Sequence, residues 1–316
     1  MKGYIPERTG LTKFVTQVIK DRHFAETEIL AEIEKAENEM LSGGIVAVGD
    51  ICNNTLTIPQ KIKGRLRYHN FIEASGFQPQ LAEQRFKRSV DFYNEYAGQS
   101  GPESSNSIVP HAPYSVSEEL WEKIIHFPGN QIMTIHNQET RGENELFLNR
   151  QGEFLDFYQA LGMDASFFRP SGKTSLQTYL SKFLPHQQLI LVHNVHTSAD
   201  DLAFCREAAN TRSLYWCFCP NANQYIGGEL PDVDMFIQQD LSIVLGTDSL
   251  ASNHQLSIVA EMQTIRQHFP SVKTGQLLGW ATINGAKALH LDNLLGSFET
   301  GKKPGVVNME ADFSGS

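Results

Sequence analysis

The sequence predicts an α/β fold built as a (β/α)8 barrel. Short apolar runs alternate with amphipathic stretches along the 316 residues, which is typical of βα units that form a parallel sheet. The runs are rich in Ile, Val, Leu and Tyr without strict alternation, as expected of strands that are buried on both faces. Most runs end in polar or glycine residues, and barrels of this type carry their active sites at that end.

Seven apolar runs are predicted as strands. They span residues 43–51, 65–74, 107–115, 132–140, 189–197, 214–222 and 241–249. A closed barrel needs an eighth strand, and the segment GLTKFVTQVI at 10–19 has a helical pattern instead. We therefore expect a TIM-like barrel whose first strand is missing from this chain.

Two helices are predicted from their end signals. Residues 25–42 place apolar side chains on one face and stop at Gly43 and Gly44, as helices commonly do. A second helix is expected to begin at Ser115, because Glu118 follows three residues later in the pattern of a capping box.

Composition excludes several classes of protein. A net charge of -10, from 36 acidic and 26 basic side chains, argues against nucleic-acid binding, which needs clustered Lys and Arg. No apolar run approaches the ~18 residues of a membrane helix, and the segment MKGYIPERTG has no apolar core of a secretory signal. The four Cys are expected to be buried reduced thiols of a cytoplasmic protein.

Ionisable side chains gather where four of the predicted strands end. They are His111, His136, Glu139, His193, His196 and Asp248. A pair of carboxylates could serve glycoside hydrolysis, but that interpretation leaves the histidines without a role. Imidazole nitrogen and carboxylate oxygen also suit Zn²⁺ or Fe²⁺. A catalytic metal lowers the pKa of its bound water from ~15.7 toward ~7, and Glu139, three residues beyond His136, could then carry protons.

Several motifs in this order resemble the cytosine deaminase and chlorohydrolase branch of the amidohydrolase superfamily. The motifs are HNQET (136–140), LVHNVH (191–196), CPNANQYI (219–226) and GTDSLASN (246–253). Segment 281–305 is similar to the closing helix of that branch and its return to a small β-domain, and VPHAPYSVS at 109–117 is similar to the fourth-strand segment of its deaminases. The motifs are specific to the branch and much less specific to a substrate.

The resemblance implies one divalent metal ion in the barrel mouth, with Zn²⁺ favoured over Fe²⁺. His136 and Asp248 would be ligands, and Asp248 would also accept a proton from the attacking water. Glu139 would protonate the substrate ring. His193 would either ligate the metal or orient the hydroxide. The residues expected to line the substrate pocket are His111, His196 and Asn223.

The chain departs from that branch in its ligand set. The branch takes two further ligands from a His-x-His motif after its first strand, and no His-x-His occurs in this sequence. Most of the accessory β-sandwich is missing as well. We therefore expect a barrel domain over 1–295, a remnant of the small β-sandwich over 296–316, and a truncated chain. A genuine degenerate paralogue is the alternative.

Two functional hypotheses remain. The first is a metal-dependent amidohydrolase that acts on C–N bonds other than peptide bonds, by hydrolytic deamination, or dechlorination, of an aromatic nitrogen heterocycle. The second is a catalytically impaired or non-catalytic barrel used for binding or assembly. The expected partner is a small heterocyclic substrate, with no nucleic acid and no membrane, and we expect a cytoplasmic homodimer.

Overall fold

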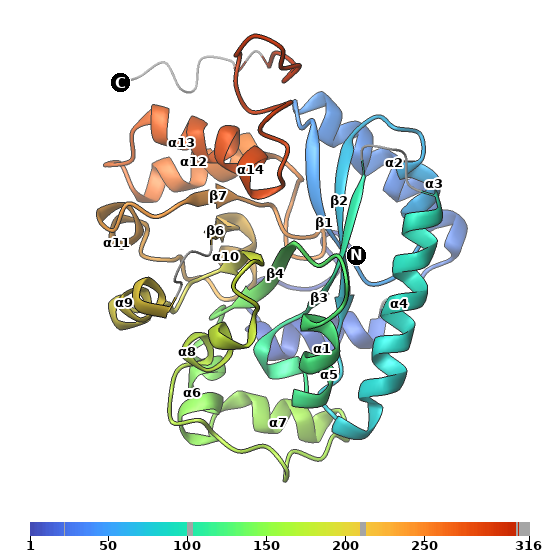
Figure 1. Cartoon of the computed structure of the whole chain (residues 1–316), viewed down its shortest axis with the longest axis vertical. Helices are drawn as coiled ribbons and strands as arrows, with labels where there is room; N and C mark the ends of the chain where they lie inside the picture. The colour runs from blue at the N-terminus through green and yellow to red at the C-terminus, as the bar shows by residue number, and fades with distance from the viewer. Residues whose placement is uncertain (22, 100–103, 209–212, 308, 310–316) are drawn as a thin grey trace.

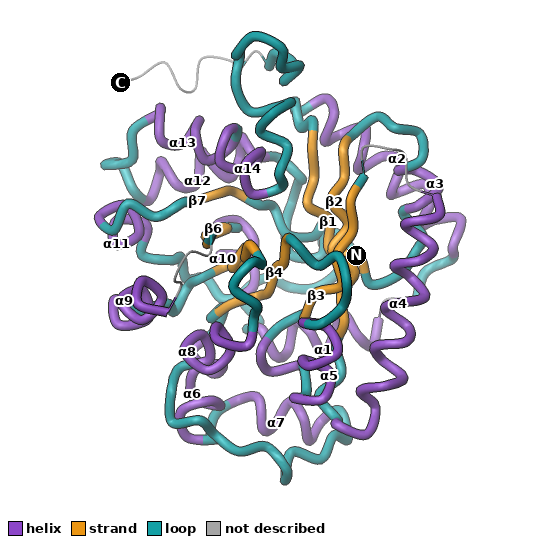
Figure 2. The backbone as a smooth tube through the Cα atoms, in the orientation of Figure 1, coloured by secondary structure: helices purple, strands orange, loops and turns teal. Residues whose placement is uncertain are grey.

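The computed structural model describes the whole chain except residues 22, 100–103, 209–212, 308 and 310–316. All seven predicted strands are present. They are β1 (Ala47–Cys52), β2 (Arg67–Ala74), β3 (Ser105–Pro110), β4 (Ile132–Asn137), β5 (Gln188–His193), β6 (Leu214–Phe218) and β7 (Ile243–Leu245). The strands run through the middle of the molecule and helices surround them (Figure 2). The predicted α/β class is therefore confirmed.

The strands form two parallel sheets, with the orders β1-β2-β3 and β4-β5-β6-β7. The sheets meet where the backbone N–H of His136, on β4, donates to the carbonyl of His111, just after β3, at 3.0 Å. Within the described part of the chain, β1 and β7 each pair with one neighbouring strand, so hydrogen bonds do not close a barrel there. Figure 1 shows the strands following one another around the molecule in chain order.

Fourteen α-helices are present among the described residues, and they surround the two sheets. They are α1 (Leu11–Asp21), α2 (Glu26–Ser42), α3 (Ile58–Lys61), α4 (Ala82–Gln99), α5 (Glu118–Ile125), α6 (Arg141–Asn149), α7 (Glu153–Ala160), α8 (Ser175–Tyr179), α9 (Ala199–Ala208), α10 (Pro220–Ile226), α11 (Val233–Gln238), α12 (Ile258–His268), α13 (Thr274–Ala281) and α14 (Ile283–Ala288). In Figure 1, α2, α3 and α4 lie outside β1 to β3, and α9, α11 and α13 lie outside the other sheet. The predicted helix over 25–42 is confirmed as α2, which ends at Gly43.

The predicted capping box at Ser115 is wrong. Helix α5 begins two residues later than expected, and its N-cap is Ser117, whose side chain accepts a hydrogen bond from the N–H of Leu120 at 3.3 Å. Gly76 explains the shift: its N–H donates to the Ser115 carbonyl and its carbonyl accepts from the Ser117 N–H. This pairing keeps Val116 extended, between a short 3-10 turn at Pro113–Ser115 and Ser117, so the helix cannot start earlier.

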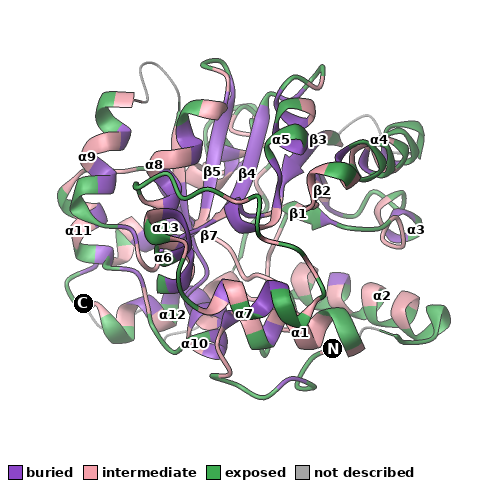
Figure 3. Ribbon diagram, turned by 90° about the horizontal axis from the view of Figure 1, so that it is seen from below, coloured by how far each residue is buried: buried purple, intermediate pink, exposed green. Residues whose placement is uncertain are grey.

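The apolar core occupies both sides of the strands. Strands β4 and β5 are buried along almost their whole length, as their colouring in Figure 3 shows. A second apolar cluster, formed around Ile5, Phe14, Tyr114, Phe154 and Tyr158, brings α1, α7 and the loop after β3 together. All four cysteines are buried free thiols, as predicted.

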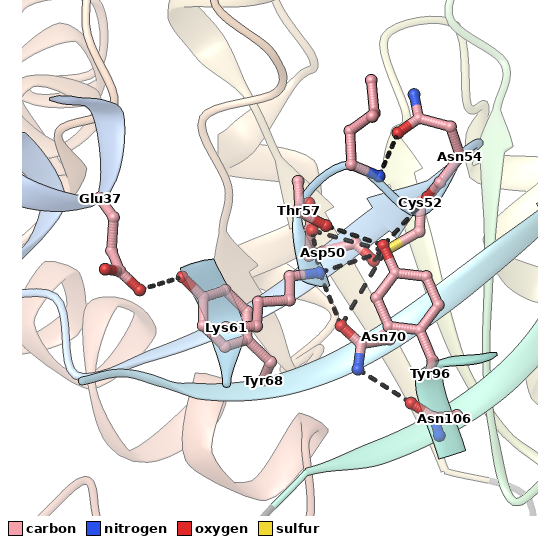
Figure 4. Close-up of polar contacts among 11 residues, drawn as sticks. Glu37, Asp50, Cys52, Asn54, Thr57, Lys61, Tyr68, Asn70, Tyr96 and Asn106 are labelled. Carbon is pink, nitrogen blue, oxygen red and sulfur yellow. Dashed lines mark hydrogen bonds and ion pairs between the residues drawn. The ribbon is translucent and has the colours of Figure 1, made fainter. Parts of the chain in front are cut away.

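A lysine is buried on the outer face of the first sheet. The ammonium of Lys61, on α3, lies 4.8 Å and 4.9 Å from the ring centroids of Tyr68 and Tyr96. It pairs with the Asp50 carboxylate and donates to the Asn70 side chain at 2.7 Å (Figure 4). These contacts fix α3 against β1 and β2.

Beyond α14, residues 296–307 are loops and turns. The division into a barrel over 1–295 and a small β-sandwich remnant over 296–316 stays a prediction, and residues 308 and 310–316 of that remnant lie outside the described residues.

Candidate metal and proton-transfer site

The candidate site lies where the parallel strands end. Four non-glycine residues there have a left-handed backbone: Gln138 (φ 46°), His193 (φ 76°), Asn194 (φ 61°) and Asp248 (φ 54°). Such conformations cost free energy of about 1–3 kcal/mol each and cluster at functional sites. Their grouping on this rim, at the ends of β4, β5 and β7, is typical of a functional site.

His136, in β4, presents one defined nitrogen to the site. Its Nδ1 lies 2.8 Å from the main-chain oxygen of His111. A carbonyl can only accept, so Nδ1 carries the hydrogen and Nε2 keeps a free lone pair. Burial, and then the neighbouring His111, lower the pKa of His136, so the ring is neutral and suited to bind a cation.

His193 closes β5 and lies beside His136, with ring centroids 5.3 Å apart. The residue is fully buried, and burial lowers its pKa to about 3. Its Nδ1 is 3.2 Å from the side-chain nitrogen of Asn223. Within the described residues, neither the Nε2 of His193 nor the Oδ1 of Asn223 has a hydrogen-bond partner. Turning the Asn223 amide over would let its oxygen accept from Nδ1–H, which would leave the lone pair on Nε2.

Glu139 faces the same ring. One of its carboxyl oxygens lies 3.6 Å from Nε2 of His193. Burial raises the pKa of Glu139 well above its usual value, and the negative charges of Asp248 and Glu143 raise it further. A raised pKa favours the protonated carboxyl, which is the state that a general acid requires.

Asp248 follows β7 and completes the predicted group of four. Its Oδ2 accepts a hydrogen bond from the Ser252 hydroxyl at 2.6 Å. Its charge acts on Glu139 and on His136 and His193. The structure thus places Asp248 close enough for its charge to shift the pKa values of His136, Glu139 and His193.

His111 is paired with a carboxylate that the sequence analysis missed. Its Nδ1 forms an ion pair with Glu73, near the end of β2. Burial opposes the charged ring, but Glu73 outweighs it and raises the pKa of His111. Glu73 could have been identified, because it stands at the carboxyl end of a predicted strand as the other candidates do.

The two remaining candidates differ in position. Asn223, on α10, contacts His193 as described above. His196 lies farther out: its Nε2 is 4.0 Å from the Glu229 carboxylate, and its side chain is 15% exposed. The substrate-binding roles of His111, His196 and Asn223 stay predictions.

A buried network of amides supports the rim from behind. The side chain of Asn137 donates to that of Asn194 at 2.9 Å and accepts from the Tyr179 hydroxyl at 2.7 Å. Gln138 donates to Asp201 at 3.0 Å and accepts from Thr197 at 2.7 Å. These bonds stabilise the rim, because they satisfy polar groups that are buried there.

The residues fit part of a metal site. The main-chain partner of the His136 ring leaves its Nε2 free, the His193 ring would match it with the Asn223 amide turned over, and Asp248 lies near both rings. However, no group of three or more His, Cys, Asp or Glu side chains in the described part of the chain is arranged to hold a metal ion. The same search of described residues finds no helix long and apolar enough to cross a membrane.

Comparison with known proteins gives consistent matches. The model of the amidohydrolase family matches residues 27–316. An adenosine deaminase from Helicobacter pylori is 27% identical over 277 residues, which cover 86% of this chain and 65% of that protein. The chain therefore spans slightly less than two thirds of this relative.

Solved structures share the fold. The aminofutalosine deaminase of Helicobacter pylori superposes with a TM-score of 0.82 at 24% identity, over 94% of this chain and 72% of that one. An atrazine chlorohydrolase mutant from Arthrobacter aurescens, complexed with zinc and atraton, gives a TM-score of 0.73 at 15% identity, over 96% and 70%. The expected TIM-barrel type of fold agrees with both structures.

Proposed function

This chain belongs to the amidohydrolase family, and from that premise we propose that it hydrolytically deaminates an aromatic nitrogen heterocycle. A purine nucleoside related to adenosine is the preferred substrate class, because the 27% identical relative above is an adenosine deaminase. Dechlorination of a triazine is less favoured, since the likeness to the chlorohydrolase extends to the fold alone.

The observation that supports this proposal most is the Glu139 carboxyl. Its pKa is raised by burial, and one of its oxygens lies 3.6 Å from Nε2 of His193. Deamination needs a proton on the ring nitrogen as water adds to the adjacent carbon, and Glu139 would donate it. Asp248 would accept the proton that the attacking water loses, and the Nε2 of His193 would either ligate the metal or orient that water.

One divalent metal ion would supply an activated water at neutral pH. Zn²⁺ is favoured over Fe²⁺. His136, His193 and Asp248 are the residues that would hold it. A zinc complex in the chlorohydrolase relative favours zinc, and the nitrogen and oxygen donors suit either metal. His111 would donate a hydrogen bond to a substrate heteroatom, with His196 and Asn223 lining the pocket.

A second function has its own supporting observation. Among the described residues, no three His, Cys, Asp or Glu side chains are arranged to hold a metal ion. The second function is therefore a barrel that binds a heterocycle, or assembles with a partner, without catalysing a reaction. The predicted homodimer and cytoplasmic location are compatible with both functions and remain predictions.

One experiment separates the two functions. The purified chain is dialysed against Zn²⁺, its metal content is measured, and it is then incubated with adenosine, 5′-methylthioadenosine and a chlorotriazine. If the chain is a deaminase, we expect about one bound metal ion per chain, and ammonia and a hydroxylated product formed in equal amounts. Bound nucleoside with no ammonia would favour the binding function, and chloride release alone would identify a dechlorinase.

A further inference from the structure

Glu143 is a buried carboxylate for which the proposed chemistry has no direct use. It lies in the first turn of α6 and is fully buried. Burial outweighs its hydrogen bonds and raises its pKa to about 7. Its Oε2 has no hydrogen-bond partner among the described residues. Burying such a group is costly, so its contacts need an explanation.

An ordinary capping role does not supply one. Thr140 is the N-cap of α6 and Glu143 is the third residue of the helix, which is the sequence pattern of a capping box. In that motif the glutamate would bond to the N–H of Thr140. Here the Oε1 of Glu143 accepts from the N–H of Gln138 at 3.0 Å instead, and the backbone of Glu139 also interacts with it.

The carboxylate therefore reaches past the helix to the turn that follows β4. That turn contains Gln138 in a left-handed conformation, and Glu139 is the next residue. Ser175, from α8, donates its hydroxyl to the same Oε1 and so fixes the position of the carboxylate. Thr140, on the other side, donates to Glu153 of α7 at 2.8 Å.

We propose that Glu143 is a positioning residue that holds the main chain of Gln138 and Glu139 and thereby aims the Glu139 carboxyl at His193. The hydrogen bond from the Gln138 N–H to Glu143 exists whatever reaction the protein catalyses. The effect of Glu143 on turnover, however, rests on the proposed function. Misplacing a reacting group by about 1 Å can lower a rate about 10²-fold, so the hold matters for a proton donor.

The test compares Glu143→Ala and Glu143→Gln with the full chain, and uses Glu145→Ala as the matched control. Glu145 lies on the same helix but is exposed. Hydrogen exchange is followed by mass spectrometry in the peptide that contains residues 136–141, with the β5 peptide as an internal reference. Circular dichroism confirms that each variant is folded.

Glu143→Ala should exchange at least about 10-fold faster at the Gln138 amide, because the N–H loses its acceptor. Glu143→Gln keeps one oxygen acceptor and should fall between Glu143→Ala and the parent, while Glu145→Ala should match the parent. Unchanged exchange in folded Glu143→Ala would overturn the proposal. If that variant does not fold, Glu143→Gln decides, since a neutral amide accepts more weakly than a carboxylate and should speed exchange about 3-fold.

Measurements of kcat and KM distinguish a positioning role of Glu143 from a purely structural one. With adenosine or the best substrate found, Glu143→Ala should lower kcat about 10- to 100-fold while KM changes little, and Glu143→Gln should recover most of the loss. Faster exchange with an unchanged kcat would refute the functional part of the proposal. A parent protein without turnover would refute the proposed function, while the exchange result would still decide whether Glu143 holds the turn.

Discussion

The main-chain carbonyl of His111 accepts a hydrogen bond from Nδ1 of His136 at 2.8 Å, across the seam between the two sheets. This contact sets both the orientation of the His136 ring and its tautomer. Because the acceptor belongs to the backbone, a side-chain substitution at 111 does not remove it. The ring of His193 is held differently, by the side chain of Asn223, and it can therefore be released by mutation.

The first prediction concerns that difference. Asn223→Ala should lower the affinity of the chain for Zn²⁺ about 10- to 100-fold, as is usual when the outer partner of a metal-binding histidine is lost. Asn223→Asp keeps an oxygen beside Nδ1 and should retain most of the affinity. Competition with a chromophoric chelator measures both, and equal affinity in all three proteins would mean that His193 does not ligate the metal.

The second prediction concerns Glu139. Glu139→Gln should retain bound metal and lower kcat about 10²- to 10⁴-fold, because an amide cannot transfer the proton. Metal content by mass spectrometry and ammonia release are measured on the same preparation. A Glu139→Gln variant with full turnover would show that another group carries the proton.

The strand ends explain how much of this site was predictable. Apolar runs locate the ends of parallel strands, and those ends must meet on one rim, so His136, Glu139, His193 and Asp248 could be grouped without a structure. Glu73 was missed because its segment, 65–74, was assigned as a strand and its end was not searched for ionisable side chains, although that end lies at the same rim. The pattern therefore identifies the rim better than it identifies the members of the site.

Other features depend on contacts between distant segments. The left-handed residues Gln138 and Asn194 are held by side chains from α9 and β4, and no local pattern encodes them. The helix start at Ser117 was missed by two residues because Gly76, far away in sequence, keeps Val116 extended. Local signals indicate which elements form, and tertiary hydrogen bonds decide where they begin.

The third prediction is a pH dependence of stability. Glu261 is fully buried, accepts hydrogen bonds from Asn221 and Asn253, and still has its pKa raised from 4.5 to about 7, chiefly by burial. Between these two values the folded protein holds a proton that the unfolded chain has already lost. The stabilisation is therefore complete at low pH and is lost as the pH rises through this window.

Glu261→Gln should remove this component. Between about pH 4.5 and 8, the free energy of unfolding of the parent should fall by about 3 kcal/mol more than that of Glu261→Gln. Urea unfolding at both ends of the range gives the difference, and the other titrating groups cancel because both proteins share them. Parallel pH profiles for the parent and the variant would contradict the raised pKa.

The last prediction concerns Lys61, whose side chain is 8% exposed beside an Asp50 side chain that is 31% exposed. Removing one partner of a buried ion pair costs about 3–5 kcal/mol, and Lys61→Ala should fall at the lower end because water can reach Asp50. Lys61→Met should cost less, since its chain still packs between the rings of Tyr68 and Tyr96. Lys63→Ala is the matched control, because Lys63 pairs with Glu34 on the exposed surface, where such pairs contribute little. The midpoints of urea unfolding compare all four proteins, and an equal loss in Lys61→Ala and Lys63→Ala would show that the buried contacts of Lys61 do not stabilise the first sheet.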